Sequence, residues 1–228
     1  MTKQHFTLKE VFDFAWAKTQ QHAWFLACTF MIYAVIMSAV KKEGFLGLLV
    51  AVLLALSLLS ISLIIVRNEN FDFSTLFERL RSPRLVINFL ILLALYACAV
   101  FVFFIPFMAA VSVATTNIML NLGADSMKLS GILIITAILL VPGIYIAVRY
   151  KFFPYVLLEN EHMRLVDVIK HTSSLTKGHF WMILQFLISL AVINTFGALA
   201  FGVGLIITVP LSVLAMANYY RRLQGHTA

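Results

Sequence analysis

The chain has 228 residues, of which 62% are hydrophobic and only 12% are charged, and its mean hydropathy is +0.97. Soluble domains are about 45–50% apolar and about 25% charged, so this composition excludes an ordinary soluble domain. A net charge of +7 could indicate nucleic-acid binding. The basic residues instead lie close to long apolar runs, where anionic lipid headgroups are the nearest partner, so we expect no nucleic-acid partner.

The apolar residues form long runs without any charged residue. About 20 apolar residues cross the ~30 Å hydrocarbon layer of a bilayer as a helix. Six runs meet this requirement: 23–40, 45–66, 85–107, 131–148, 180–200 and 203–219. The sequence therefore predicts an all-α integral membrane protein, a single polytopic domain over 1–228 with six transmembrane helices arranged as three hairpins. Because only Phe201 and Gly202 separate the last two runs, one bent helix remains the alternative there.

The basic residues fall mainly on alternate connections. Fourteen of the 17 Lys and Arg residues lie in the N-terminal stretch, the second and fourth connections and the C-terminal tail. The other side of the membrane would hold only Lys41, Lys42 and Lys128. Since Lys and Arg are retained in the cytoplasm, both termini are predicted to be cytoplasmic, in the inner (plasma) membrane of a bacterium.

An interfacial helix is predicted before each hairpin, at about 7–20, 72–81 and 161–176. The first and third copies align without a gap at an offset of 157 residues, which places Thr19 on Thr176 and Trp24 on Trp181. Amphipathic helices of this kind lie in the headgroup plane, and tryptophan anchors the start of a span at the interface. The alignment favours an internal repeat with an axis along the membrane normal. The alternative is that these are ordinary amphipathic loops.

The first copy also carries signals for where its helix begins. Thr7 and Glu10 form a capping box, and Phe6 and Val11 are placed as a hydrophobic staple. The apolar stripe then recurs at helical spacing in both copies. Its residues are Leu8, Val11, Phe12 and Ala15 in the first copy and Leu165, Val168, Ile169 and Thr172 in the third.

Candidate lipid-binding residues gather near the fourth connection. We predict that six basic or titratable residues contact anionic headgroups: Arg149, Lys151, Lys170, His171, Lys177 and His179. The alternative is a solvated interfacial cluster. Glu159, Glu161 and Asp167 could act with His162, but charge pairs such as Asp167 with Lys170 explain the carboxylates better. No catalytic constellation, metal-ligand spacing or cofactor motif is found, and we expect no enzymatic activity.

Three predicted spans contain a proline, at Pro106, Pro142 and Pro210. Proline cannot donate the hydrogen bond of its helical turn, so these residues predict helix kinks. Broken helices can form transporter sites, although proline is common in membrane helices. In the fifth span, Asn194 lies on the opposite face from Gln185, which favours helix–helix hydrogen bonds over a pore.

The C-terminal half resembles a known family over about residues 140–222. The resemblance is carried by Pro142-Gly143-Ile144-Tyr145, Arg149, the acidic 159–161 and the run Leu175-Thr176-Lys177-Gly178-His179-Phe180-Trp181. These motifs are similar to those of the multi-pass membrane domain attached to some bacterial glycerophosphoryl diester phosphodiesterases and to its uncharacterised stand-alone relatives. His171 and Thr172 replace the arginine and serine usual there. The resemblance implies a similar topology and carries over no catalytic residue.

Three hypotheses for function follow. The first is a non-enzymatic inner-membrane protein that contacts lipid or acts as a scaffold in the envelope, and the second is a transporter of a lipid-like or apolar solute. Ion-coupled transport usually needs Asp, Glu, Lys, Arg or His inside the membrane, and the predicted spans contain none of these. The third hypothesis, a lipid enzyme, lacks a recognisable catalytic set. Protein partners and oligomeric state are not predicted.

Overall fold

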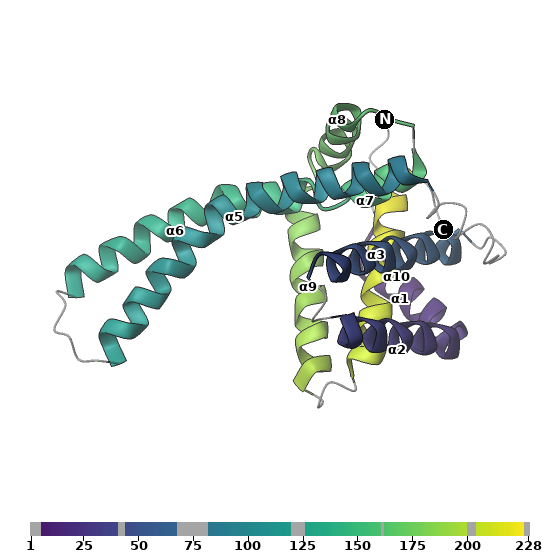
Figure 1. Cartoon of the computed structure of the whole chain (residues 1–228), viewed down its shortest axis with the longest axis horizontal. Coiled ribbons are helices and arrows are strands. Elements are labelled where there is room, and N and C mark those ends of the chain that lie inside the picture. Colours follow the sequence, from purple (N-terminus) through teal and green to yellow (C-terminus); the bar gives the residue numbers. More distant parts are fainter. Residues whose placement is uncertain are drawn as a thin grey trace. The chain divides into compact units, whose positions relative to one another are not determined.

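The computed structural model describes residues 6–40, 44–67, 82–119, 126–160, 162–199 and 204–225. Within these ranges the regular secondary structure is entirely helical (Figure 1). The helices are α1 (Leu8–Gln21), α2 (Ala23–Val40), α3 (Phe45–Val66), α5 (Pro83–Met119), α6 (Ser126–Arg149), α7 (Phe153–Glu159), α8 (Leu165–Thr176), α9 (Phe180–Leu199) and α10 (Leu205–Leu223).

The chain divides into two compact units. The first comprises Met1–Phe89 and Phe152–Ala228, and the second comprises Leu90–Lys151. Helix α5 begins in the first unit and continues through the second, which also contains α6.

Helix α10 is the centre of the first unit. It contacts α1, α2, α3 and α9, and α2 and α3 lie side by side across the direction of α9 and α10 (Figure 1). The residues near its C-terminal end are the most buried, and Ala217, Asn218, Tyr219 and Tyr220 have no exposed surface. The core of this unit therefore surrounds the tyrosine pair that ends the apolar part of α10.

No pattern in the sequence indicated α7, which lies within the predicted fourth connection. Its apolar run is too short to cross a bilayer, so it carried no transmembrane signal. Pro154 lies in its first turn, where proline needs no hydrogen-bond donor. Residues 155–158 are buried, and Phe152, immediately before the helix, is also fully buried. This short helix thus belongs to the core of the first unit.

Helices α1 and α8 bury equivalent stripes. In α1 the buried residues are Val11, Ala15 and Thr19. In α8 they are Val168, Thr172 and Thr176, which are the same positions at the offset of 157 residues. Each stripe is spaced by four residues and so follows one face of its helix. The side of α1 expected to face lipid is buried within the protein, where α1 packs along α10.

The second unit pairs the greater part of α5 with α6. The Tyr96 hydroxyl donates a hydrogen bond to the carbonyl oxygen of Ala147 at 3.1 Å. A Cβ atom added at Gly143 would lie 2.8 Å from Cβ of Phe103, so glycine allows the two helices to approach closely. Pro106 and Pro142 lie inside continuous helices. Helix α5 ends at Met119 and α6 begins at Ser126, so both helices extend beyond the predicted spans 85–107 and 131–148.

Among the described residues, four helical segments are long and apolar enough to cross a membrane: Leu49–Val66, Pro83–Thr116, Thr136–Glu159 and Phe180–Leu199. Six spans and three hairpins remain a prediction. Within α2, Ala23–Ile36 counts as a shorter apolar helix. The polar end of α10, from Asn218 to Arg222, lowers the hydropathy of that helix.

Candidate functional site

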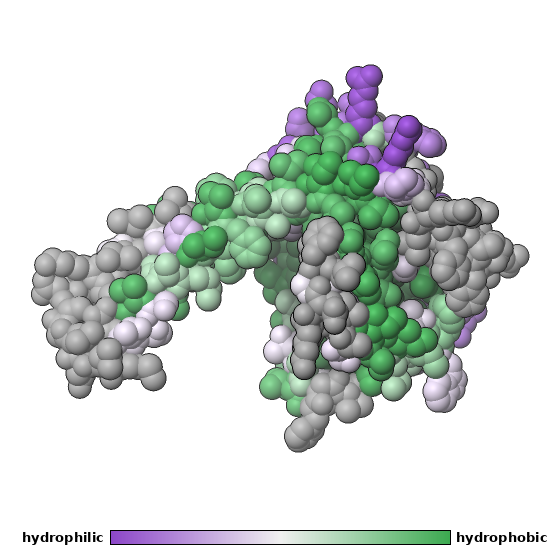
Figure 2. Space-filling model, in the orientation of Figure 1, coloured by the Kyte–Doolittle hydropathy of each residue, from purple (hydrophilic) through white to green (hydrophobic). Residues whose placement is uncertain are grey.

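The exposed cations of the predicted lipid site lie on α8 and just after it. Lys170 and Lys177 are exposed, whereas His171 and His179 are partly buried, and the Nδ1 atoms of both histidines are buried without a hydrogen-bond partner. Hydrophilic side chains gather over α8 above a mainly hydrophobic surface (Figure 2). Gly178, with φ +86°, provides the left-handed turn between α8 and α9.

The other two predicted lipid contacts belong to the second unit. Arg149 donates a hydrogen bond to the Tyr145 hydroxyl, and its guanidinium carbon lies 5.4 Å from the centroid of that ring. Lys151 is partly buried. The six-residue cluster predicted from the sequence is therefore divided between the two units.

The two predicted interface anchors both point outward. The exposed fraction is 85% for Trp24 and 73% for Trp181. Each lies in the first turn of its helix, α2 or α9, at equivalent positions of the proposed repeat. An indole in such a position can reach the headgroup region of a bilayer.

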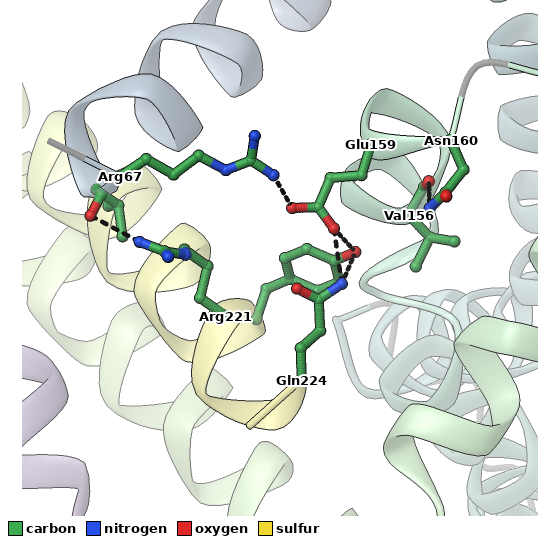
Figure 3. Close-up of polar contacts among 8 residues, drawn as sticks. Arg67, Val156, Glu159, Asn160, Arg221 and Gln224 are labelled. Carbon is green, nitrogen blue, oxygen red and sulfur yellow. Dashed lines mark hydrogen bonds and ion pairs between the residues drawn. The ribbon is translucent and has the colours of Figure 1, made fainter. Parts of the chain in front are cut away.

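Glu159, at the end of α7, is bound by residues from two other helices (Figure 3). Arg67, which follows α3, forms an ion pair with its Oε1 atom. The Tyr220 hydroxyl and the Gln224 amide nitrogen donate to Oε2 at 2.7 and 2.6 Å. Arg221 donates to the carbonyl oxygen of Val66 at 3.0 Å. These bonds join the ends of α3, α7 and α10.

Burial and the nearby Glu159 carboxylate both raise the pKa of Tyr220. Its hydroxyl therefore stays protonated and acts as a hydrogen-bond donor to the carboxylate. Because the carboxylate accepts bonds from three side chains, the arrangement holds helices together and offers no free base. The sequence placed Glu159 in an acidic group with Glu161 and Asp167. Glu161 lies outside the described residues, and the partners of Glu159 are distant in sequence.

Aromatic rings surround the tyrosine pair of α10. Tyr219 stacks on Phe186 of α9, with ring centroids 4.4 Å apart, and on Phe152, at 5.7 Å. Tyr155 of α7 stacks on Tyr220 at 5.3 Å. No pattern in the sequence indicates this cluster, because its members come from segments that are far apart in the chain.

Half of the predicted capping box is seen at the start of α1, where the Thr7 side chain caps the helix and the Glu10 carboxylate accepts from the Thr7 hydroxyl. Thr7 Oγ1 accepts from the Glu10 backbone nitrogen at 3.4 Å and donates to the Glu10 carboxylate at 2.9 Å. Arg222 forms an ion pair with that carboxylate at 2.8 Å. The hydrogen bond from Thr7, followed by the one from Arg222, lowers the pKa of Glu10. Phe6 lies edge-on against Tyr219, with ring centroids 5.2 Å apart.

Helices α9 and α10 meet through small and polar residues. Asn194 donates to the Ser212 hydroxyl at 2.8 Å, a helix–helix hydrogen bond of the kind the sequence favoured. A Cβ atom at Gly204 would lie 2.7 Å from both Cα and the carbonyl oxygen of Gly197. Pro210 lies inside α10 and is buried.

An open groove of about 320 Å³ lies between α1, α2 and α10. Trp16 and Gln20 of α1, Trp24 of α2 and Ile207 and Pro210 of α10 are among its lining residues. It was not foreseen, because the sequence did not indicate that α1 runs along α10. Within the described part of the chain, no group of three or more His, Cys, Asp or Glu residues could hold a metal ion.

No curated protein and no solved structure matches the chain. One family model matches residues 11–227, nearly the whole chain. The match gives no evidence of a relationship to the phosphodiesterase membrane domain that the C-terminal half resembles, so that resemblance remains a prediction. The chain therefore belongs to the family described as "Protein of unknown function (DUF975)".

Proposed function

We propose that this protein is a non-enzymatic, multi-pass protein of the bacterial inner membrane that binds anionic phospholipid headgroups at its cytoplasmic face. Both termini would lie in the cytoplasm, in accord with the distribution of Lys and Arg along the chain. The apolar helices supply the bilayer-embedded part. No protein partner and no oligomeric state is part of this proposal.

The observation that carries the proposal is the arrangement around α8. The buried stripe of α8 packs against the rest of the protein, whereas Lys170 and Lys177 are exposed. Trp181 is exposed in the first turn of α9, four residues after Lys177 in the chain. Two exposed cations followed by an exposed indole match the headgroup layer, where each Lys contributes about 1 kcal/mol of attraction to an anionic leaflet.

The test uses the fluorescence of Trp181 in a Trp16→Phe/Trp24→Phe background, since the chain has 3 tryptophans. The protein is reconstituted into vesicles in which either the anionic or the zwitterionic phospholipid carries bromine on its acyl chains, which quenches tryptophan on contact. We expect stronger quenching by the anionic lipid, and we expect this preference to weaken with salt. Lys170→Gln/Lys177→Gln should abolish it, whereas Lys9→Gln, an exposed lysine of α1, should leave it intact.

Equal quenching by the two lipids in the unmodified lysine background would contradict the proposal. So would a preference that survives removal of both lysines. The two brominated lipids are compared in vesicles of the same overall charge. This separates contact between Trp181 and a particular headgroup from general attraction of the protein to the surface.

A second candidate function is movement of a lipid-like or apolar solute, which the open groove beside α10 supports. Proteoliposomes that contain a fluorescent phospholipid test this directly, because dithionite bleaches only the outer leaflet. Bleaching beyond the outer-leaflet fraction would support transport. Bleaching limited to that fraction would favour the non-transporting function. We also propose that the C-terminal half shares the topology of the phosphodiesterase membrane domain, which its motifs support.

A further inference from the structure

The groove beside α10 owes its space to small residues. Ala23 and Ala27 lie one helical turn apart on α2 and both line it. The wall opposite is formed by Ile206, Ile207 and Pro210 of α10. Because α1 runs antiparallel to α10, with Phe6 near Tyr219 and Thr19 near Ile206, its C-terminal turn closes a third side.

The chemistry of the groove suits a hydrocarbon chain. Among the described residues that line it, none is ionisable, and most are aliphatic or aromatic. Ile207 is 52% exposed and Trp16 is 48% exposed, so apolar surface is open to the surroundings. An acyl chain in the groove would make van der Waals contacts with these apolar side chains.

Two residues that line the groove, Thr19 and Gln20, have short or flexible polar side chains. Gln20 is exposed, and the Thr19 hydroxyl donates to the carbonyl oxygen of Ala15 at 2.7 Å. Pro210 has no backbone N–H, so the carbonyl oxygen of Ile206 lacks its usual helical donor. Acceptors such as this carbonyl and the Gln20 amide oxygen would suit a lipid headgroup that carries hydroxyl or ammonium donors.

Trp16 and Trp24 border the same groove, and Trp24 is 85% exposed. Tryptophan is enriched where the acyl chains of a bilayer meet the headgroups. We propose that this groove is a binding site for one acyl chain of a bilayer phospholipid. Its uncharged lining predicts no preference for anionic lipids, in contrast to the cationic site at α8. The proposal requires that the protein lie in a bilayer and is independent of Lys170 and Lys177.

The experiment uses Trp16 and Trp24 as reporters in a Trp181→Phe background. Detergent-solubilised protein is titrated with a zwitterionic phospholipid brominated on its acyl chains, at low mole fraction in mixed micelles. We expect saturable quenching, and native mass spectrometry should show one retained lipid per chain. Ala23→Leu/Ala27→Leu fills the groove and should weaken retention about tenfold, which corresponds to about 1.4 kcal/mol of lost contact energy.

The matched control is Ala34→Leu, which adds the same side chain at an exposed position of α2 outside the groove. It should bind lipid like the parent. Quenching that rises linearly with lipid mole fraction, or equal retention by the groove variant and the control, would overturn the proposal. A change in oligomeric state that occurs in the groove variant but not in the control would also overturn the proposal, because the groove would then be occupied by a second copy of the chain.

A melting profile that matches the parent shows that the groove variant is folded. If the variant is unstable, brominated lipid competed by unlabelled zwitterionic and anionic phospholipid on the parent still decides the question. Equal competition supports the groove site, and competition by the anionic lipid alone contradicts it. Because Trp181 is absent here, failure of this test leaves the α8 proposal standing.

Discussion

Glu159 is the residue at which the ends of three helices meet. Its carboxylate is only partly accessible, with 13% of the side chain exposed, and it accepts from Arg67, Tyr220 and Gln224. Desolvating a carboxylate is costly unless such donors compensate, so the cluster is stable only when complete. Tyr220 depends on the same carboxylate for its hydrogen bond.

We therefore expect Glu159→Gln to destabilise the protein by about 1–3 kcal/mol, because Arg67 loses its counter-charge in a partly buried setting. Thermal unfolding in detergent, followed by circular dichroism, measures the change. The control is Glu10→Gln, whose carboxylate also pairs with an arginine but has 52% of its side chain exposed. That change should lower the melting temperature by much less than Glu159→Gln does, because exposed ion pairs contribute little to stability. Similar melting temperatures for the two variants would refute the importance of the Glu159 cluster.

At the level of elements, α9 and α10 approach one another through glycine. The positions of Gly197 and Gly204 leave no room for a side chain, and Thr208 also lies against Gly197. Close contact of this kind strengthens van der Waals packing where hydrophobic exclusion from water contributes little. The Asn194–Ser212 hydrogen bond adds a polar link between the same two helices.

Gly204→Ala should force the two helices apart and destabilise the protein by about 1–3 kcal/mol, the usual cost of overpacking. Gly131→Ala in α6 is the control, since a Cβ atom there would meet nothing within 4 Å. In a helix this control should be neutral or stabilising by up to about 1 kcal/mol. Unfolding curves of the two variants, recorded side by side, provide the comparison. Equal stability would show that the glycine contact is unimportant.

Several helix bounds follow directly from the sequence. Charges and Gly44 delimit the apolar runs of α2 and α3, which begin and end at the residues expected for the first two spans. The N-terminus of α1 follows from its capping residue, Thr7. Local patterns suffice there because capping and hydropathy depend on neighbours in the chain.

Other features required knowledge of contacts between distant segments. Helix α7 is short and apolar, a pattern that periodicity cannot assign. The partners of Glu159 lie 61 to 92 residues away in sequence, and no local rule pairs them. The groove depends on the packing of α1 along α10, which the amphipathic pattern of α1 does not specify. The sequence therefore indicated the amphipathic helix α8 and its lysines, but it indicated neither the carboxylate cluster nor the groove.

For the whole molecule, the distribution of charge predicts the orientation in the membrane. Lys and Arg crowd the connections assigned to the cytoplasm, and the structure places Arg67, Arg221 and Arg222 together around the ends of α3 and α10. The ends of α3 and α10 thus lie together within the first unit. This agrees with the prediction that Arg67, Arg221 and Arg222 are all cytoplasmic.

A green fluorescent protein fused after Ala228 should fluoresce, and alkaline phosphatase at the same point should be inactive, because that enzyme needs the oxidising periplasm. Alkaline phosphatase inserted between Gly123 and Ala124, in the predicted outer connection, should be active. Fluorescence and phosphatase activity measured in intact cells check the two fusions and the insertion. The reverse pattern would refute the orientation and, with it, the cytoplasmic location proposed for α8.

The packing of α1 along α10 has a consequence for biosynthesis. Helix α1 is synthesised well before α10, the helix that it packs along through the stripe of Val11, Ala15 and Thr19. Until α10 is made, the apolar stripe of α1 is uncovered, and the surface of the bilayer is a favourable location for such an amphipathic helix. The packing of α1 against α10 therefore follows the synthesis of all the helices between them. A nascent polypeptide stalled before Leu205 would expose an N-terminal segment that the finished protein conceals.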